Sequence, residues 1–421
     1  MRRMDRFLPA SPPPLRPGAV LHGPGSQAVD RLLQRFAATL IARGFRVEGV
    51  IQRLARAIDD CAERMELVDV ATGHAYNITQ NLGSGSQSCK VDPMGVAEAS
   101  AVLRRALGGG ADLLIVNKFA GLEAGGSGLS AEMLAAMADG MPVLTSVGSR
   151  FTTEWVTFTG GYTDLLCPAM DALWRWWGPH RLYRDLVLGV AGDAEARRAE
   201  IRRVVIGAQW IMVDAGNRVG LASRPAVTLN EPLPPPGRWV GRGLLELAEQ
   251  AASGWDSLTV AAGVAALNAF YNHAGVTGSG GNGLDLFRGA TGRVVVIGSF
   301  PGIQKRLPHA QVVDFAPKPG EYPAAAGDWL LAGAEGAAIT ASALANRTLP
   351  GLLSAARGAR VALIGPGTPL TPRLFDYGID SLCGFVAQDV DRIAEVILAG
   401  GSSKDFHRFG RFVTLERPPG E

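Results

Sequence analysis

The sequence is poor in the residues that mark several common binding and catalytic sites. Only five of its 41 basic residues are lysines, and none of them stands between a glycine and a serine or threonine. This excludes the Walker A loop, whose lysine binds the β- and γ-phosphates of a nucleotide. The six histidines form neither an HxH nor an HExxH motif, and the cysteines lack CxxC spacing, so neither a zinc finger nor a disulfide framework is expected. The four cysteines are Cys61, Cys89, Cys167 and Cys383.

The chain also lacks a strong charge of one sign and long apolar runs. The net charge is only +2, which argues against a nucleic-acid-binding protein. No run of about 18 apolar residues occurs, so we expect no membrane span. Residues 1–18 are basic and proline-rich without the apolar stretch of a signal peptide, and scattered cysteines fit a reducing compartment. We therefore expect a cytoplasmic protein whose partner is a small molecule or a metal, and self-association stays open.

The length of 421 residues and an apolar content of 47% are sufficient for two or three folded domains. Strands alternate with helices in two parts of the chain, which predicts two mainly parallel sheets covered by helices. Between them, strands over Arg202–Met212 and Arg218–Ala222 predict a hairpin, and two helices follow it. We predict four segments, namely a flexible, proline-rich leader at 1–17, an α/β domain at 18–178, a small α+β module at 182–275 and a Rossmann-like, doubly wound α/β domain at 276–415.

A glycine-rich loop follows the first predicted strand. Residues 23–26, with the sequence GPGS, lead into a predicted helix, and such a loop can present backbone N–H groups to an anion. It can equally be a tight strand-to-helix turn. A later apolar strand ends at Asn117, where a nucleotide-hydrolysing P-loop enzyme would have a magnesium-binding Asp, and Glu123 follows as a possible base or ligand. Because the Walker lysine and that Asp are both missing, we expect no nucleotide hydrolysis.

A second loop, in the segment ITQNLGSGSQSCKVDP (78–93), is rich in hydrogen-bond donors. Its glycines allow the positive φ angles that turn successive N–H groups inward, and the serine hydroxyls and one ammonium group add further donors. We expect an oxyanion such as phosphate, sulfate or molybdate to bind here, unless the loop is only a solvated connection. The predicted oxyanion-binding residues are Gly83, Ser84, Gly85, Ser86, Ser88 and Lys90.

The sequence of the last predicted α/β domain indicates a ligand-binding crevice. Its strands are each followed by polar, glycine or proline residues, and parallel strands place such loops at one edge of the sheet. Asp314 follows Gly298 by sixteen residues, as an acid that binds a ribose would, although the GxGxxG pattern is absent. Each loop alone can also be a turn that needs glycine or proline. The predicted strands are Val294–Ile297, Gln311–Phe315, Ala337–Thr340, Val361–Ile364 and Ser381–Phe385. The predicted ligand-binding residues are Asn282, Asp285, Gly298, Ser299, Pro301, Asp314, Thr340, Asn346, Gly365, Gly367 and Thr368.

The candidate metal ligands are few. His273 stands at a predicted helix end, shortly before Asp285, where the two C-terminal modules should meet. With Asp314 nearby, these side chains could form a site of nitrogen and oxygen ligands. A single histidine can also be a structural residue. Cys383 lies in an apolar strand and is expected to be a buried structural thiol.

The N-terminal part resembles a known family. The segments ITQNLGSGSQSCKVDP, LIVNKFAGLEAGGSGLSAEM, GMPVLTSV and FTTEWVTFTGG resemble a bacterial family of proteins of unknown function. The resemblance covers about residues 18–178. It implies a P-loop nucleoside-triphosphatase-like fold that has lost its Walker lysine, and an association with molybdate transport.

The C-terminal part resembles a different family, described only as heavy-metal chelation. The segments that carry the resemblance are GNGLDLF, VVVIGSFPGI, ITASALANRTLPGLL and VALIGPGTPLTPRLFDYGID. It covers about residues 182–415. It implies a module like the enolase N-terminal fold followed by a Rossmann-like sheet, and a role in corrinoid or other metal-cofactor metabolism.

These observations favour one function and leave two others open. The leading hypothesis is a cytoplasmic protein that binds a transition metal, a metal oxyanion or a metal-bearing cofactor in the C-terminal crevice. From the resemblance, molybdate is the first candidate ligand, and tungstate or another transition metal stays open. The alternatives are a nucleotide- or cofactor-dependent enzyme of corrinoid or molybdenum metabolism, and a regulatory or scaffold protein. No nucleophile–base pair is evident for the enzyme alternative.

Overall fold

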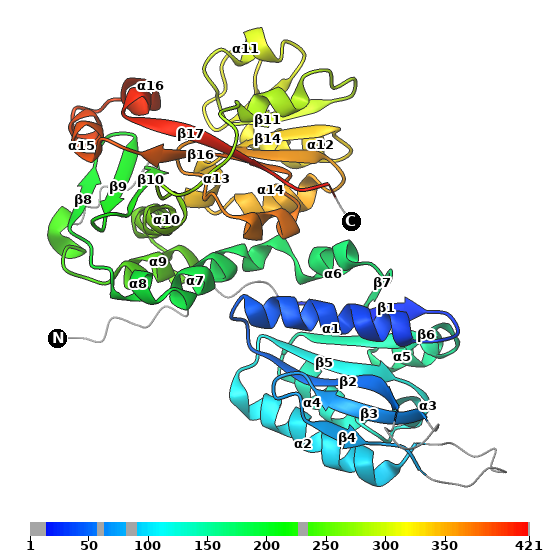
Figure 1. Cartoon of the computed structure of the whole chain (residues 1–421). Helices are drawn as coiled ribbons and strands as arrows, with labels where there is room; N and C mark the ends of the chain where they lie inside the picture. Colours follow the sequence, from blue (N-terminus) through cyan, green and yellow to red (C-terminus); the bar gives the residue numbers. More distant parts are fainter. Residues whose placement is uncertain (1–13, 57–62, 81–90, 226–234, 420–421) are drawn as a thin grey trace, which may run out of the picture. The chain divides into compact units, whose positions relative to one another are not determined.

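The computed structural model describes residues 14–56, 63–80, 91–225 and 235–419. The chain divides into two compact units, one ending at Trp177 and the other beginning at Gly178. We call them the N-terminal unit and the C-terminal unit and describe each by itself (Figure 1). Most of the predicted leader lies outside the described residues. At its end, the backbone oxygen of Pro17 accepts a hydrogen bond of 2.7 Å from the Thr163 hydroxyl.

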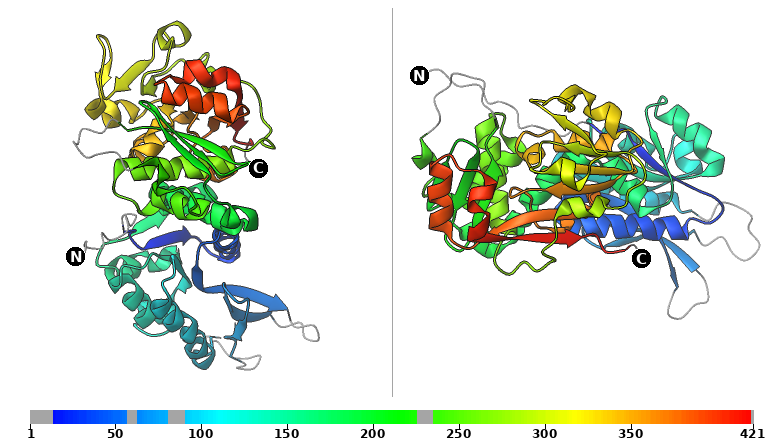
Figure 2. Two further views of the ribbon diagram at one scale, coloured as in Figure 1. Left: turned by 90° about the vertical axis from the view of Figure 1, so that its left-hand side faces the viewer. Right: turned by 90° about the horizontal axis from the view of Figure 1, so that it is seen from above.

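A seven-stranded sheet forms the centre of the N-terminal unit, in the order β4-β3-β2-β5-β6-β1-β7. Strands β2, β5, β6, β1 and β7 run parallel, whereas β3 and β4 are antiparallel, and β2 and β3 form a long pair (Figure 2). The predicted mainly parallel α/β sheet is therefore confirmed. The strands span Gly18–His22 (β1), Val47–Arg56 (β2), Glu63–Asp69 (β3), Ala75–Asn77 (β4), Leu113–Phe119 (β5), Val143–Gly148 (β6) and Asp164–Leu166 (β7).

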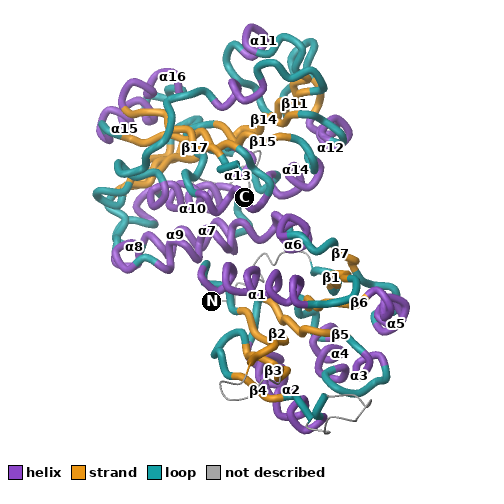
Figure 3. The backbone as a smooth tube through the Cα atoms, turned by 45° about the vertical axis from the view of Figure 1, so that its right-hand side comes forward, coloured by secondary structure: helices purple, strands orange, loops and turns teal. Residues whose placement is uncertain are grey.

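Helices cover both faces of this sheet, and α1 and α2 lie on opposite sides of it (Figure 3). The apolar residues of α1 recur every three or four positions, so that Val29, Leu33, Phe36 and Leu40 form its buried face. The Asp92 carboxylate caps α2 by accepting a backbone N–H from the first turn. The helices span Gln27–Ala42 (α1), Pro93–Gly109 (α2), Gly121–Ala124 (α3), Ser130–Ala138 (α4), Thr152–Phe158 (α5) and Met170–Trp177 (α6).

A small α+β module opens the C-terminal unit. Three antiparallel strands, in the order β10-β9-β8, pack against α10, and α9 lies beside α10 (Figure 1). The single strand expected over Arg202–Met212 is wrong: the Gly207 N–H bonds to the Trp210 carbonyl oxygen, which turns the chain between β8 and β9. The elements span Leu182–Gly192 (α7), Ala194–Arg198 (α8), Arg203–Ile206 (β8), Trp210–Asp214 (β9), Val219–Ser223 (β10), Leu244–Ser253 (α9) and Ser257–Tyr271 (α10).

A second seven-stranded sheet forms the rest of the C-terminal unit, in the order β13-β12-β11-β14-β15-β16-β17. All neighbouring pairs are parallel except β16 and β17, which lie side by side in opposite directions (Figure 2). The edge strand β17 was not predicted. The strands span Val294–Ile297 (β11), Gln311–Asp314 (β12), Tyr322–Pro323 (β13), Gly336–Thr340 (β14), Arg360–Ile364 (β15), Ser381–Ala387 (β16) and Gly410–Glu416 (β17).

The chain reverses its direction of travel across this sheet between β11 and β14. It runs outward from β11 through β12 to β13, and then returns to the other side of β11 to form β14, β15 and β16. Such a switch point is where open α/β sheets bind ligands. The helices span Ile303–Arg306 (α11), Gly327–Leu331 (α12), Ser342–Ala345 (α13), Leu349–Ala355 (α14), Val390–Leu398 (α15) and Ser403–Phe406 (α16). Among the residues that the structure describes, no helix is long and apolar enough to span a membrane.

Candidate ligand-binding crevice

A cavity of about 750 Å³, which we call the crevice, lies at the carboxyl edge of the C-terminal sheet. Its wall includes the ends of β11, β12, β14 and β15 and the loops that follow them. Trp210 and Ser223 contribute a wall from the α+β module. The crevice therefore lies over the switch point, and its volume is in the range that holds a small organic molecule.

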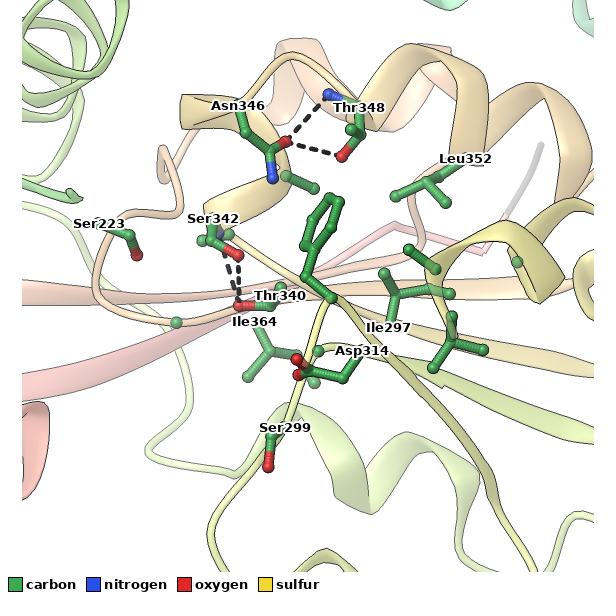
Figure 4. Close-up of a pocket in the computed structure, with 18 of the residues that line it drawn as sticks. Ser223, Ile297, Ser299, Asp314, Thr340, Ser342, Asn346, Thr348, Leu352 and Ile364 are labelled. Carbon is green, nitrogen blue, oxygen red and sulfur yellow. Dashed lines mark hydrogen bonds between the residues drawn. The ribbon is translucent and has the colours of Figure 1, made fainter. Parts of the chain in front are cut away.

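Seven of the eleven residues predicted to bind the ligand line the crevice. They come from four strand ends that are distant in sequence, and Figure 4 shows Asp314, Thr340 and Asn346 facing a common space. Their convergence is a property of the fold, and their contact with a ligand stays a prediction. The seven residues are Gly298, Ser299, Pro301, Asp314, Thr340, Asn346 and Gly365.

The polar side chains of the crevice are partly fixed by one another. The Ser342 hydroxyl donates to Thr340 Oγ1 at 3.3 Å, and Asn346 Oδ1 accepts bonds from the Thr348 hydroxyl at 2.7 Å and its backbone N–H at 3.1 Å (Figure 4). The Asp314 carboxylate accepts the Ala316 backbone N–H at 2.9 Å. These bonds fix the positions of the polar groups, and each group can still donate or accept a further hydrogen bond with a ligand.

Gly298 lets β11 and β14 approach each other at the switch point. Its φ angle is +95°, in the left-handed region that favours glycine, and a Cβ atom there would lie 2.6 Å from Thr340 Cγ2. A side chain at this position would therefore collide with the crevice wall.

Gly367 and Thr368 do not line the crevice, contrary to the prediction. Thr368 is fully buried, and its carbonyl oxygen accepts a bond of 2.9 Å from the Asn272 side chain. The Gly367 carbonyl oxygen likewise accepts a bond of 2.9 Å from Asn268. Because α10 uses this loop to attach the α+β module to the sheet, the loop continues into the core after Pro366.

Asn282 and Asp285 also lie outside the crevice lining. Asn282 caps a short helical turn by accepting the Leu284 N–H at 3.0 Å. Asp285 forms ion pairs with Arg288 at 3.0 Å and Arg306 at 3.5 Å. Both side chains therefore serve the local structure of the segment that leads into β11.

The predicted metal pair of His273 and Asp285 finds no further ligand. His273 is exposed, and its Nδ1 faces the Gly275 N–H at 3.2 Å. Within residues 14–56, 63–80, 91–225 and 235–419, no group of three or more His, Cys, Asp or Glu side chains could hold a metal ion. Cys383 is buried, as expected, and burial raises the pKa of its thiol.

The crevice residues that were not singled out from the sequence as ligand-binding include His180, Trp210, Phe315 and Arg347. Burial, and then the neighbouring Arg181, lower the pKa of His180, which favours the neutral form of its ring. Phe315 is 75% exposed, which is unusual for a large apolar side chain and leaves its ring available to a ligand. Phe315 directly follows Asp314, the last residue of β12. Its position after a strand could have indicated from the sequence that it lies at the ligand-binding edge of the sheet.

A second cavity, of about 600 Å³, adjoins the GPGS loop of the N-terminal unit. Lys118 reaches this loop from β5, and its Nζ donates to Ser26 Oγ at 3.1 Å. Asn117 donates to Asp30 at 2.7 Å and accepts a bond from the Ser146 hydroxyl at 2.6 Å. The amide is thus held in a network between the sheet and α1.

The other two polar features predicted for the N-terminal unit have different outcomes. Glu123 is buried, and its carboxylate accepts the backbone N–H groups of Ala120 and Leu129 at 3.1 and 3.2 Å. Burial raises the pKa of Glu123 in spite of these bonds. Its contacts therefore indicate a structural role. The predicted oxyanion-binding residues from Gly83 to Lys90 lie outside the described residues, and that site stays a prediction.

The N-terminal part is similar to a family of unknown function and to one relative that is named for molybdenum import. Residues 18–176 match the family model "Protein of unknown function (DUF2478)". A relative from Bradyrhizobium diazoefficiens, "Molybdenum import ATP-binding protein ModC 2", is 40% identical over 165 residues. The match covers 38% of this chain and 18% of that relative, so the chain spans less than a fifth of the relative's length.

The C-terminal part is similar to a structurally known family. A protein of unknown function from the DUF364 family of Desulfitobacterium hafniense is 27% identical, with a TM-score of 0.51. The match covers 56% of this chain and 98% of that one. A DUF364 protein from Pyrococcus horikoshii is 19% identical with a TM-score of 0.46, over 56% of this chain and 99% of that one.

Two family models account for this C-terminal similarity. Residues 191–271 match the DUF4213 model and residues 283–416 match the DUF364 model, and both carry the description "Putative heavy-metal chelation". The boundary between the two models falls between the α+β module and the Rossmann-like sheet, so the crevice takes residues from both. The chain thus joins an N-terminal part that matches the DUF2478 family to a C-terminal part that matches the DUF4213 and DUF364 families.

Proposed function

We propose that the C-terminal unit binds a small organic ligand that carries or chelates a metal, and that the crevice is its binding site. The observation that supports this most is a cavity of about 750 Å³ over the switch point, lined by four strand ends and by the α+β module. The description of both C-terminal families as heavy-metal chelation supports the link to a metal.

The composition of the crevice favours an organic ligand over a bare ion. Its ionisable oxygen and nitrogen ligands are Asp314, Asp328 and His180, and no set of three among the described residues could hold a metal. A bare cation needs four or more ligands from protein and water. A tetrahedral oxyanion would fill only a small part of the cavity, since one water molecule occupies roughly 30 Å³. An organic molecule could supply the missing metal ligands itself.

Molybdenum is the first metal that we propose to test. The motive is the similarity of the N-terminal part to a protein named for molybdenum import. The two units need not act on the same ligand, so the metal must be identified directly.

Elemental analysis and native mass spectrometry of the full chain, purified without an affinity tag, test the proposal. Molybdenum, tungsten, cobalt, nickel, iron and zinc should be measured, followed by titration with each ion in the presence and absence of citrate. We expect a metal to bind together with an organic mass. Ser299→Trp places a bulky ring at the exposed rim of the crevice and should abolish this binding.

The matched control is Ser257→Trp, at an exposed position in the first turn of α10. It should leave binding unchanged. A metal that binds without any organic partner, or binding that survives Ser299→Trp, would contradict the proposal.

A further inference from the structure

Arg347 is one of the residues that line the crevice, and no described carboxylate neutralises its charge. Its Nε is buried and makes no hydrogen bond with any described residue. One Nη atom donates to the Ala251 carbonyl oxygen at 2.7 Å, and the guanidinium carbon lies 5.7 Å from the centre of the Tyr183 ring. Neither partner is a carboxylate, so the positive charge remains unpaired within the described chain.

The backbone at Arg347 is held in an unfavourable conformation. Its φ angle is 61°, and Arg347 is the single non-glycine residue with a positive φ among the described residues. A conformation of this kind costs about 1–3 kcal/mol for a residue other than glycine, and it is found where the surrounding structure enforces it. The fold therefore keeps a large cation at a position where glycine or asparagine would be more stable.

Asp314 and Arg347 lie on opposite sides of the switch point. Asp314 ends β12, whereas Arg347 follows α13, which comes after β14. Asp328 lies in α12, which contacts both β11 and α14. Arg347 forms no ion pair with either carboxylate, and the lowered pKa of His180, the fourth titratable group of the lining, favours its neutral form. Burial lowers the pKa of Arg347, which is the expected effect of an unpaired buried cation.

Asn346 adds a second donor beside Arg347. Its Oδ1 is occupied by two bonds from Thr348, so its orientation is fixed, and Nδ2 makes no hydrogen bond with the described residues. Figure 4 shows this amide nitrogen turned toward the space between the labelled side chains. An amide N–H and a guanidinium on one wall are donors that match the oxygens of a carboxylate or a phosphate.

We infer that the ligand of the crevice is a small organic anion, whose carboxylate or phosphate group pairs with Arg347 and Asn346. Hydroxyl or amine groups of the same molecule face Asp314 on the opposite wall. This inference rests on the proposed function, because it concerns the same crevice. The inference goes beyond the proposed function because it gives the ligand a negatively charged group and places that group on one side of the switch point.

Simple anions test the inference without knowledge of the natural ligand. Inorganic phosphate and succinate, titrated calorimetrically into the full chain at constant ionic strength, represent the two anion classes, and succinamide is the neutral counterpart of succinate. We expect saturable binding of at least one of the two anions and none of succinamide. Arg347→Gln should weaken that binding at least tenfold, and Arg347→Lys should weaken it less, because lysine keeps the charge but loses the planar fork.

Two further variants keep the test decisive. Asn346→Asp leaves Arg347 in place and adds a negative charge beside it, so it should also weaken binding, even if Arg347→Gln does not fold. Arg357→Gln removes one positive charge from an exposed position outside the crevice and should leave the affinity unchanged.

The outcomes separate this inference from the proposed function. The inference would be overturned if neither phosphate nor succinate binds saturably. It would also be overturned if Arg347→Gln and Asn346→Asp both bind the anion with the affinity of the wild type. If a metal–organic ligand still binds Arg347→Gln with unchanged affinity, the proposed function survives and the anion assignment fails. If Arg347-dependent anion binding is found but no metal accompanies any ligand, the anion assignment stands and the metal proposal fails.

Discussion

Asp314 is the crevice residue for which the position in the sheet supports the proposed binding role most directly. It is the last residue of β12, and its carboxylate is oriented by the Ala316 N–H while its other oxygen remains available to the crevice. In Rossmann-like sheets, a glycine-rich loop follows one strand and an acidic residue at the end of the next strand hydrogen-bonds the hydroxyl groups of a ribose. We therefore propose that Asp314 accepts hydrogen bonds from a neutral or basic part of the ligand.

Asp314→Asn should lower the affinity for the ligand that accompanies the purified protein by about 10- to 150-fold, the effect of a charge-assisted hydrogen bond of roughly 1.5–3 kcal/mol. The amide oxygen can still accept the Ala316 N–H, so the thermal midpoint should hardly change. Calorimetric titration and thermal unfolding measure the two quantities. Asp391→Asn, at a position that is 83% exposed, is the control. Equal affinity in wild type and Asp314→Asn would remove this residue from the site.

The misplacement of Thr368 shows what sequence reasoning at single residues could not resolve. Thr368 follows a strand and a glycine pair, as a ligand-binding residue would, but Asn268 of α10 and Asn272, directly after that helix, bind the backbone of its loop. Both asparagines are buried at the end of a largely apolar helix. Polar residues in such a stretch were the available signal. It indicates that a backbone segment must be satisfied there, but not which segment.

At the level of elements, strand ends were predicted better than edge strands. The predicted bounds of Val294–Ile297 coincide with β11, because a short apolar run between Arg and Gly has few alternatives. β17 was missed, since its residues 410–416 are only half apolar and its pairing with β16 depends on contacts distant in sequence. Arg347 was missed as a site residue for the same reason, because its unpaired state is visible only once α9 and Tyr183 are placed beside it.

The end of β3 carries a buried carboxylate, Asp69, that should make the N-terminal unit sensitive to acid. Burial alone would raise the pKa of Asp69, but hydrogen bonds from Thr72, Arg105 and the Ala71 N–H outweigh it and lower the pKa below its ordinary value. The folded state therefore binds this proton less readily than the unfolded state. The resulting stabilisation is present above about pH 4 and is lost as the pH falls through the lowered pKa.

Asp69→Asn should accordingly reduce the free energy of unfolding of the N-terminal unit at pH 7 by roughly 1–3 kcal/mol. Urea unfolding of both proteins between pH 7 and pH 3 measures the difference. We expect the gap between wild type and variant to narrow as the pH falls below about 4. A gap that is constant over this range would mean that the charge of Asp69 contributes nothing. Glu66→Gln, which breaks a surface pair with Arg53, is the control, and its effect should be below about 1 kcal/mol.

The GPGS loop and the end of β5 form an element pair that lacks the charges for phosphoryl transfer. Asn117 offers an amide where a magnesium-binding carboxylate would be needed, and it is already bonded to Asp30 and Ser146. Lys118, in β5, contacts Ser26 and supplies an ammonium group to the cavity. No group of side chains among the described residues could hold the magnesium ion that phosphoryl transfer also needs. The absence of a three-ligand metal set holds for all described residues of this unit.

We therefore expect no magnesium-dependent hydrolysis of ATP or GTP by the full chain. Phosphate release should equal the background and be the same for Lys118→Ala as for wild type. A turnover on the order of 1 per second that is lost in Lys118→Ala would show that the prediction is wrong. Binding of a nucleotide without turnover would remain compatible with it.

For the whole molecule, the two units have separate hydrophobic cores. The core of the N-terminal unit includes Phe119 and Trp155, and the cores of the C-terminal unit include Val296 on one face of its sheet and Phe406 at the α+β module. The crevice is built from C-terminal residues alone. The family matches divide the chain at the same place, between residues 176 and 191. Stability and ligand binding should therefore be assignable to one unit at a time.

Differential scanning calorimetry of the full chain should resolve two unfolding transitions. Trp155 and Phe406 are both fully buried. Trp155→Ala should reduce the free energy of unfolding of the N-terminal unit alone by about 3–5 kcal/mol, and Phe406→Ala should reduce that of the C-terminal unit alone by a similar amount. Each variant should therefore lower the midpoint of one transition only. A ligand of the crevice at 100 times its dissociation constant should stabilise only the transition that Phe406→Ala lowers, by about 2.7 kcal/mol. A single transition that both variants and the ligand shift together would mean that the units unfold as one. In that case ligand binding in the crevice would be coupled to the state of the N-terminal unit, which could then act as its regulator.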